Sequence, residues 1–305
     1  MGYFTTLRRD VFPAVVNDIP VSPEFSLASA RTMLWAAQAA YEGASPARLM
    51  DLAATWGWTN LTALTPDGSD FPSPVASRGF SARAGQTTII SFTGTEPDQL
   101  RDLITNFNIL RTADGEHTGF KEGVASVWPA IRTVVARAPA GIVLTGHSLG
   151  AALAATAAQR LLNEHAAGPE KILAVYTYGM PRTGYVEWAN AYDAPGGLGE
   201  KTFRLVHGDD LVTKVPPASV LGFRHVGRYL ACPSGGLFRG VPAPAQTEAP
   251  PFDQAPPAAS WLPAPLAGPA YPAENFPAVL AAAALPAALR DHLPDRYLRA
   301  LGVTL

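Results

Sequence analysis

Ser148 lies in the pentapeptide GHSLG at residues 146–150, whose residue types suit covalent catalysis. A short apolar run, Ile142–Leu144, precedes it, and a run rich in alanine and leucine follows it. A strand, a sharp turn and a helix around G-x-S-x-G form a nucleophile elbow, in which the serine sits on a strained turn. This geometry is expected to expose Oγ and to point the N–H of Leu149 at a developing oxyanion. The alternative is a glycine-flanked turn with a capping serine, but the flanking strand and helix patterns favour a nucleophile.

A serine nucleophile needs an imidazole to accept its proton and a carboxylate to fix the tautomer of that imidazole. In α/β hydrolases these groups follow the serine in the order Asp or Glu, then His. Asp209 and Asp210 come directly after the β-branched run FRLVH, in the kind of late loop that carries the acid. Either carboxylate could serve at this stage of the argument.

The chain has six histidines, and chain order and position remove four of them as the base: His117, His147, His165 and His207. His225 and His292 both follow the two aspartates. The residues around His225 (Phe223, Val226, Tyr229) suggest a strand, in which an imidazole would hydrogen-bond to backbone inside the fold. His292 lies between an apolar helical run and the segment PDRYLRAL, at a loop-to-helix junction suited to presenting a base to an elbow.

The elements that must position these residues follow from the hydrophobic periodicity. Residues 22–43 read as a capped amphipathic helix, residues 79–85 and 86–95 as adjacent strands, and residues 119–138 as a helix bent near Pro129. Later residues alternate between strand and helix patterns, with strands at 172–179 and 201–208 and a helix at 184–194. Alternating strands and helices predict an α/β fold with a mostly parallel central sheet and helices on both faces.

A proline-rich insert at residues 233–286 interrupts this alternation, with nearly half of the chain's 29 prolines. We expect a loop that wraps the surface. The alternative is a cover over the active site, carrying Phe252, Trp261 and Tyr271. Helical periodicity resumes after the insert, and residues 1–305 are expected to form a single domain.

Composition excludes several classes of protein. With 305 residues, 48% of them hydrophobic, the chain can bury a large core, and a formal net charge of −2 offers no basic surface for nucleic acid. Cys232 is the only cysteine, so an intramolecular disulfide is impossible, and we expect it to be a small buried residue. No run reaches the roughly 18 apolar residues of a membrane span, and residues 1–20 lack the apolar core of a Sec signal. These patterns predict no integral membrane segment, and a protein that stays in the cytoplasm or leaves by a non-Sec route.

Several motifs in order resemble those of class 3 lipases, the α/β-hydrolase family that includes the filamentous-fungal triacylglycerol lipases. They are FTGT at 92–95 for F-R-G-[ST], GEHTGF at 115–120 for V-H-x-G-F, GHSLGAALA at 146–154, YGMPRTG at 178–184 for Y-G-x-P-R-x-G, DDLVTKVPP at 209–217 for N-D-x-V-P-x-L-P, and FRHVG at 223–227 for [FY]-x-H-x-G. The match runs from about Ser26 to Leu301 and is weakest in the insert.

This resemblance implies an assignment for the open choices. It makes Asp210 the triad acid, His292 the base and His225 a structural residue, and it gives Thr95 as an oxyanion-binding residue together with Leu149. Thr93 stands where the family has an arginine, and Leu103 and Asn106 lie where fungal lipases carry lid residues. These departures put a fungal-type lid in doubt.

The expected function is hydrolysis of acylglycerol or other lipid esters through an acyl-serine intermediate, without a metal or organic cofactor. The alternatives are a phospholipase A1-type or a feruloyl or short-chain esterase activity on the same scaffold. A catalytically silent α/β hydrolase that serves as a binding module is the non-enzymatic alternative. The expected partners are a lipid or small-ester substrate and, peripherally, a lipid surface.

Overall fold

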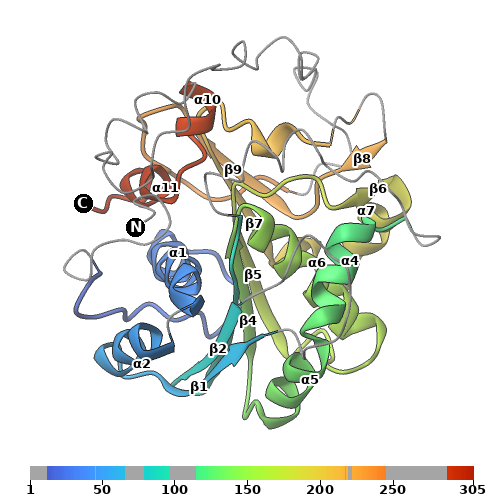
Figure 1. Ribbon diagram of the computed structural model, residues 1–305. Helices are drawn as coiled ribbons and strands as arrows, with labels where there is room; N and C mark the ends of the chain where they lie inside the picture. The colour runs from blue at the N-terminus through green and yellow to red at the C-terminus, as the bar shows by residue number, and fades with distance from the viewer. Residues whose placement is uncertain are drawn as a thin grey trace, which may run out of the picture.

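A central β-sheet organises the computed structural model, which describes residues 12–44, 46–65, 79–95, 115–216, 218, 222–244 and 287–305 (Figure 1). In the described part the sheet has seven strands in the order β1-β2-β3-β4-β5-β7-β9. β1 to β3 pair antiparallel, and β3, β4, β5, β7 and β9 pair parallel. The strands are β1 (Thr59–Leu64), β2 (Gly79–Ala84), β3 (Thr87–Phe92), β4 (Ile142–His147), β5 (Ile172–Tyr178), β7 (Thr202–His207) and β9 (Arg228–Cys232).

Helices cover both faces of this sheet (Figure 1). One face carries α1 (Leu27–Ala40), α2 (Pro46–Thr55) and α11 (Pro294–Ala300), and the other carries α4 (Thr118–Ser126), α5 (Trp128–Arg137), α6 (Leu149–Asn163) and α7 (Val186–Tyr192). The short elements are α10 (Ala287–Arg290), the 3₁₀ turns Tyr41–Ala44, Gly199–Lys201 and Val212–Lys214, and a two-stranded sheet of β6 (Gly184–Tyr185) and β8 (Phe223–Arg224).

The core has two halves, because alternate residues of a strand point to opposite faces of the sheet. Ile89 and Val143 belong to the buried cluster that includes α1, whereas Ile90 and Leu144 belong to the cluster that includes α6. All six residues of β4 are buried. Its first three residues, Ile142, Val143 and Leu144, form the apolar run expected of a parallel strand that is covered on both faces. The predicted α/β architecture with a mostly parallel sheet is therefore confirmed.

Local signals predicted several of these elements, with two corrections. The helix predicted at residues 22–43 begins later, because α1 starts at Leu27. The Ser26 hydroxyl caps α1 by accepting the N–H of Ser29 at 2.9 Å. The single bent helix predicted at residues 119–138 is wrong, because α4 ends at Ser126 and α5 begins at Trp128. Pro129 lies in the first turn of α5, where its missing N–H leaves no hydrogen bond unmade.

The proline-rich insert is described only at its start. Residues 233–244 follow β9, and Ala243 pairs with Tyr229 in an isolated antiparallel bridge. The aromatic residues that could cover the active site, Phe252, Trp261 and Tyr271, lie outside the described residues. Within the described ranges, no helix is both long enough and apolar enough to cross a membrane.

Candidate active site

The turn between β4 and α6 holds Ser148 in a strained backbone conformation, with φ 60° and ψ −131°. The glycines on either side permit the crossing of strand and helix. A Cβ atom on Gly146 would collide with the backbone of Gly150, and one on Gly150 would collide with the carbonyl of Phe92 in β3. The sequence signature of an elbow thus corresponds to a real close approach of three backbone segments.

The expectation that this turn exposes Oγ is wrong, because Ser148 is completely buried. The loop after β3 packs against it. A Cβ atom on Gly94 would lie 3.0 Å from Ser148 Cβ and would collide with the hydroxyl of Tyr41 and the carbonyl of His147. Ser148 Oγ has no hydrogen-bond partner among the described residues.

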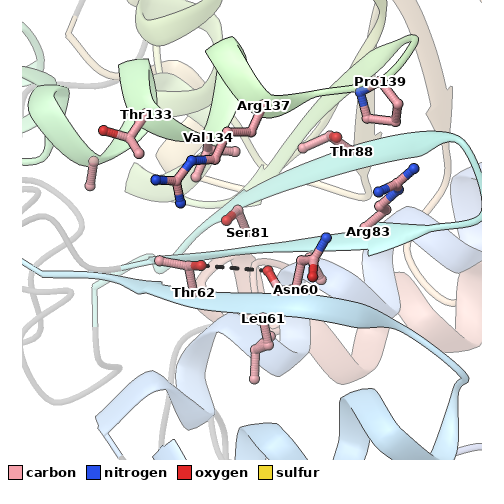
Figure 2. A pocket seen from close by; sticks show the side chains of 12 residues that line it. Asn60, Leu61, Thr62, Ser81, Arg83, Thr88, Thr133, Val134, Arg137 and Pro139 are labelled. Carbon is pink, nitrogen blue, oxygen red and sulfur yellow. Dashed lines mark hydrogen bonds between the residues drawn. The ribbon is translucent and has the colours of Figure 1, made fainter.

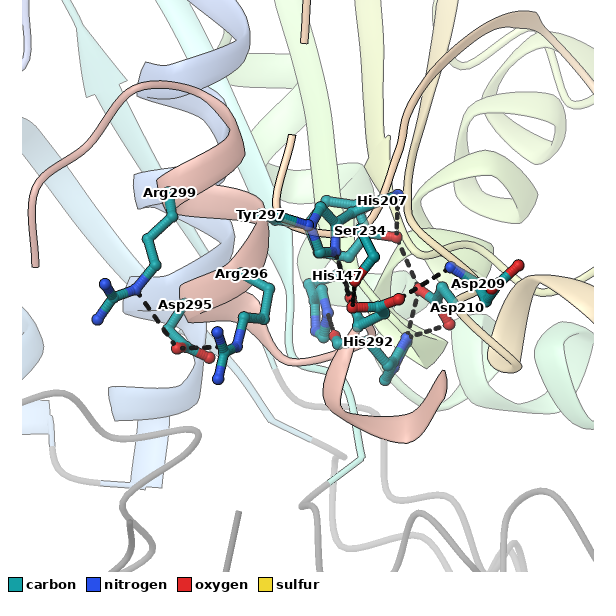
Figure 3. Close-up of polar contacts among 12 residues, drawn as sticks. His147, His207, Asp209, Asp210, Ser234, His292, Asp295, Arg296, Tyr297 and Arg299 are labelled. Atoms are coloured by element: carbon teal, nitrogen blue, oxygen red, sulfur yellow. Dashed lines mark hydrogen bonds and ion pairs between the residues drawn. The ribbon is translucent and has the colours of Figure 1, made fainter. Parts of the chain in front are cut away.

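A buried carboxylate–imidazole pair forms between Asp210 and His292. His292 Nδ1 lies 2.9 Å from Asp210 Oδ1 and 2.8 Å from Oδ2 (Figure 3). Tyr297 donates its hydroxyl to Oδ2 at 2.6 Å, and the N–H of Val212 donates to Oδ1 at 2.9 Å. Burial alone raises the pKa of Asp210, but the attraction of His292 and the hydrogen bonds from His292 and Tyr297 outweigh it, so the pKa lies below its ordinary value. The carboxylate is therefore ionised at neutral pH.

This pair fixes the tautomer of His292. Because Nδ1 carries the proton donated to Asp210, Nε2 is the unprotonated nitrogen that can accept a proton. His292 Nε2 is buried and has no hydrogen-bond partner in the described part of the chain. The imidazole thus presents a free acceptor, the property that a general base needs.

The backbone between β5 and the following loop connects Ser148 to this pair. The N–H of Ser148 donates to the carbonyl of Tyr178 at 2.9 Å. The next residue, Gly179, has φ 60°, and a Cβ atom there would lie 2.7 Å from Asp210 Oδ2 and 2.9 Å from His292 Nδ1. The side chains of Asp210 and His292 therefore lie one residue along the backbone from the partner of Ser148, at the carboxyl ends of β4, β5 and β7.

A second imidazole supports the segment that carries His292. His147 Nε2 donates to the carbonyl of His292 at 2.7 Å, and its Nδ1 accepts the hydroxyl of Tyr41 at 2.8 Å. Burial, followed by the positive charge that His292 can carry, lowers the pKa of His147 to about 3. His147 is therefore neutral and keeps both hydrogen bonds across the pH range in which proteins are usually studied.

The structure distinguishes the two candidate acids and the two candidate bases. The side chain of Asp209 is 83% exposed and lies 3.7 Å from Lys214 Nζ, whereas Asp210 is the carboxylate on His292. His225 donates from Nε2 to the carbonyl of Thr213 at 2.8 Å, and burial lowers its pKa well below the ordinary value. A backbone hydrogen bond is what the sequence predicted for His225.

The two predicted oxyanion residues are Leu149 in the elbow and Thr95 in the loop after β3. Leu149 is the first residue of α6, where N–H groups have no partner within the helix. Thr95 follows Gly94 and is half-buried. Thr93, which replaces the family's arginine, donates its hydroxyl to the carbonyl of Ala40 at 2.7 Å. The loop after β3 is thus tied to the C-terminal end of α1 by a hydroxyl.

A cavity of about 520 Å³ lies elsewhere, between β1, β2 and α5 (Figure 2). Arg83 and Arg137 line it together with hydroxyl groups such as that of Ser81. None of the predicted site residues borders this cavity. The buried Cys232, whose pKa burial raises to about 11, is likewise unsuited to nucleophilic chemistry.

The sequence was compared with protein families and with known proteins. Residues 89–220, which include the elbow and the acid loop, match the family model described as "Lipase (class 3)". Over these residues the chain is similar to class 3 lipases. The chain is 38% identical over 137 residues to the secreted mono- and diacylglycerol lipase 1 of Fusarium solani, and the match covers 41% of this chain and 38% of that protein. A lipase of Rhizopus oryzae is 29% identical to the chain over 187 residues, and this match covers 56% of this chain and 47% of that lipase.

Solved structures show a similar fold. The crystal structure of the lipase from Rhizopus microsporus var. chinensis superposes with a TM-score of 0.56 at 21% identity, covering 79% of this chain and 90% of that one. The fold is therefore that of the α/β-hydrolase fungal lipases. The chain spans less than half the length of the curated relatives that it matches.

Two residues that complete the site were not among the site residues predicted from the sequence. Tyr41 and Tyr297 contact His147 and Asp210 across 106 and 87 residues of chain. Both lie in helical patterns in which an aromatic residue is ordinarily part of the core. Only the three-dimensional structure places their hydroxyls.

Proposed function

We propose that this chain hydrolyses carboxylic esters of lipids, with Ser148 as nucleophile, His292 as general base and Asp210 as the carboxylate that holds the imidazole. The observation that carries the proposal is the buried Asp210–His292 pair, which leaves His292 Nε2 as a free acceptor beside the strained serine turn. Among the described residues, Ser148 Oγ and His292 Nε2 have no hydrogen-bond partner. In the proposed reaction, a rotation of the serine side chain on substrate binding brings Oγ to Nε2.

The proposed reaction has two halves. Ser148 Oγ attacks the ester carbonyl and gives its proton to His292 Nε2, and the tetrahedral oxyanion accepts hydrogen bonds from the N–H groups of Leu149 and Thr95. The intermediate collapses, the bond to the alcohol oxygen breaks, and His292 returns the proton to the leaving alcohol. Water then attacks the acyl-serine, with His292 again as base, and releases the carboxylic acid. Asp210 stays ionised throughout and stabilises the imidazolium.

The substrate class that we propose is acylglycerol. The Fusarium solani relative is a mono- and diacylglycerol lipase by name. The complete burial of Ser148 also fits an ester whose acyl chain displaces apolar contacts on entering. Phospholipid and short-chain esters are the competing substrates on such a scaffold, because acyl and alcohol preferences reside in loops.

A substrate panel tests this proposal. We expect the purified protein to hydrolyse p-nitrophenyl esters and to act on monoacyl- and diacylglycerol faster than on phospholipid, and we expect a fluorophosphonate to label Ser148. Mass spectrometry of the labelled peptide identifies the modified residue. A preference for phosphatidylcholine would replace acylglycerol with phospholipid in the proposal. A folded protein that neither labels nor hydrolyses any ester would point to a catalytically silent binding module.

The two neighbouring aspartates allow a matched comparison of the acid. Asp210→Asn is expected to lower kcat by about 10⁴-fold, because an amide at this place favours the wrong tautomer of His292. Asp209→Asn, in which an exposed carboxylate is lost, is expected to stay within about twofold of the parent protein. Steady-state hydrolysis of one p-nitrophenyl ester by both variants measures this difference. Equal losses would show that the wrong aspartate has been chosen.

A further inference from the structure

Asp291, directly before His292, makes contacts that the proposed reaction does not use. We propose that Asp291 is a positioning residue, which fixes the segment that carries His292 against the loop that carries Asp210. The inference rests on the proposed function, because it concerns the alignment of the proposed base. It assigns a role to a carboxylate that does not itself contact the reacting atoms.

The carboxylate of Asp291 bridges two loops at the carboxyl end of the sheet. Oδ2 accepts the N–H of Asp209 at 2.9 Å, in the loop after β7. Oδ1 accepts the hydroxyl of Ser234 at 2.8 Å, in the loop after β9. Asp291 is only 7% exposed, so these hydrogen bonds are shielded from competing water. His207, Asp209 and Ser234 gather beside His292 in Figure 3.

The backbone of Asp291 is held as well. Its carbonyl lies 3.1 Å from His207 Nδ1, while His207 Nε2 accepts the N–H of Gly235 at 3.2 Å. Since Nε2 accepts, Nδ1 carries the proton and donates to the carbonyl. His147 donates to the next carbonyl, that of His292. Two imidazoles thus hold two consecutive carbonyls of the segment that bears the base.

These contacts act next to the catalytic pair. The hydrogen bond from the N–H of Asp209 to Asp291 joins the residue before Asp210 to the residue before His292. It therefore sets the separation of the two segments whose side chains must meet at 2.8 Å. Gly208, with φ 57°, leaves the necessary space, because a Cβ atom there would collide with Asp291 Oδ2.

A nearby carboxylate supplies the matched control. Asp295 lies four residues further along the same segment, 3.6 Å from Arg296 and 3.9 Å from Arg299. In Figure 3 these three residues lie on the side away from Asp210. Loss of Asp295 removes ion pairs of α11 and an acid from the first turn of that helix, without altering a contact to the acid loop.

The test compares Asp291→Ala, Asp291→Asn and Ser234→Ala with Asp295→Ala, all measured at least 15 °C below the melting temperature of the least stable variant. We expect Asp291→Ala to lower kcat for a p-nitrophenyl ester by about 100-fold, the cost of misplacing a base by about 1 Å, with KM changed less than about threefold. Asp291→Asn, which retains an acceptor oxygen, and Ser234→Ala should lose about three- to tenfold. Asp295→Ala should keep the parent kcat even where it lowers the melting temperature.

A second readout does not depend on activity. The proton of His292 Nδ1 should give a low-field ¹H NMR resonance, assigned by its loss in His292→Ala. We expect this resonance to broaden or disappear in Asp291→Ala and to persist in Asp295→Ala. Parent kcat together with an unchanged resonance in Asp291→Ala would overturn the positioning role while leaving the proposed function intact.

The remaining outcomes are equally decisive. If Asp291→Ala does not fold, Asp291→Asn and Ser234→Ala decide, and parent kcat in both overturns the proposal. If the unmodified protein hydrolyses no ester, the proposed function fails, and the His292 resonance alone decides whether Asp291 aligns the segment. An equal kcat loss in Asp295→Ala would reduce the effect to general destabilisation and also contradict the proposal.

Discussion

Ser148→Ala is expected to lower ester hydrolysis by about 10⁴- to 10⁶-fold, because the nucleophile, base and acid act as a unit and only oxyanion and binding contacts remain. The fold should survive. Alanine meets the same strained φ of 60° as serine does, and the hydroxyl that is lost has no hydrogen-bond partner among the described residues. The loss should therefore appear entirely in activity.

Steady-state hydrolysis, thermal melting and fluorophosphonate labelling of the purified variant measure this effect. Ser126→Ala is a matched control, since Ser126 is also buried but donates its hydroxyl to the carbonyl of Gly123 within α4. We expect the control to retain the parent kcat. Hydrolysis by Ser148→Ala within tenfold of the parent rate would remove Ser148 as the nucleophile.

His292→Ala is expected to abolish labelling by a fluorophosphonate at neutral pH and to lower kcat by a factor comparable to that of Ser148→Ala. The substitution removes the imidazole that contacts Asp210 and leaves that buried carboxylate with hydrogen bonds from Tyr297 and Val212. Without the attraction of His292, the pKa of Asp210 should rise. The variant should therefore lose less stability than the parent protein does as the pH falls.

His225→Ala provides the comparison for the base. The substitution removes a hydrogen bond to the carbonyl of Thr213. We therefore expect the unfolding free energy to fall by about 1 kcal/mol, with a lower melting temperature, and we expect fluorophosphonate labelling to remain measurable. The labelling rates of both variants, determined on protein shown to be folded by circular dichroism, separate the two histidines. Normal labelling of His292→Ala beside a folded but unreactive His225→Ala would reverse the assignment.

The sequence predicted the elbow and α1 because both depend on local patterns. Gly146 and the capping Ser26 act on residues within a few positions of themselves, whereas Gly150 also leaves room for Phe92 of β3. The break between α4 and α5 was predicted only as a bend, since Pro129 is compatible with either a kinked helix or a new first turn. Tertiary packing decided between the two.

Contacts between distant segments account for what the residues alone could not predict. Asp209 and Asp210 are adjacent, and only the packing of Tyr297 and His292 against the end of β7 distinguishes the buried carboxylate from the exposed one. Asp291 meets Asp209 across 82 residues of chain. An aspartate before a helix ordinarily reads as a favourable charge at the helix N-terminus, so nothing in its local sequence signalled this contact.

The C-terminal segment that carries His292 is translated long after the segment that carries Ser148, and it can pack against the rest of the fold only then. It is tied to the N-terminal part of the chain by a hydrogen bond from Arg31 Nε to the carbonyl of Leu301 at 2.9 Å. His292 follows Ser148 by 144 residues (292 − 148), which a ribosome needs roughly 7 to 30 s to add at about 5–20 residues per second. A nascent chain thus carries the proposed nucleophile for seconds before the proposed base is made. On the proposed mechanism, we expect ester hydrolysis to begin only after translation has passed residue 292 and α11 has packed against α1.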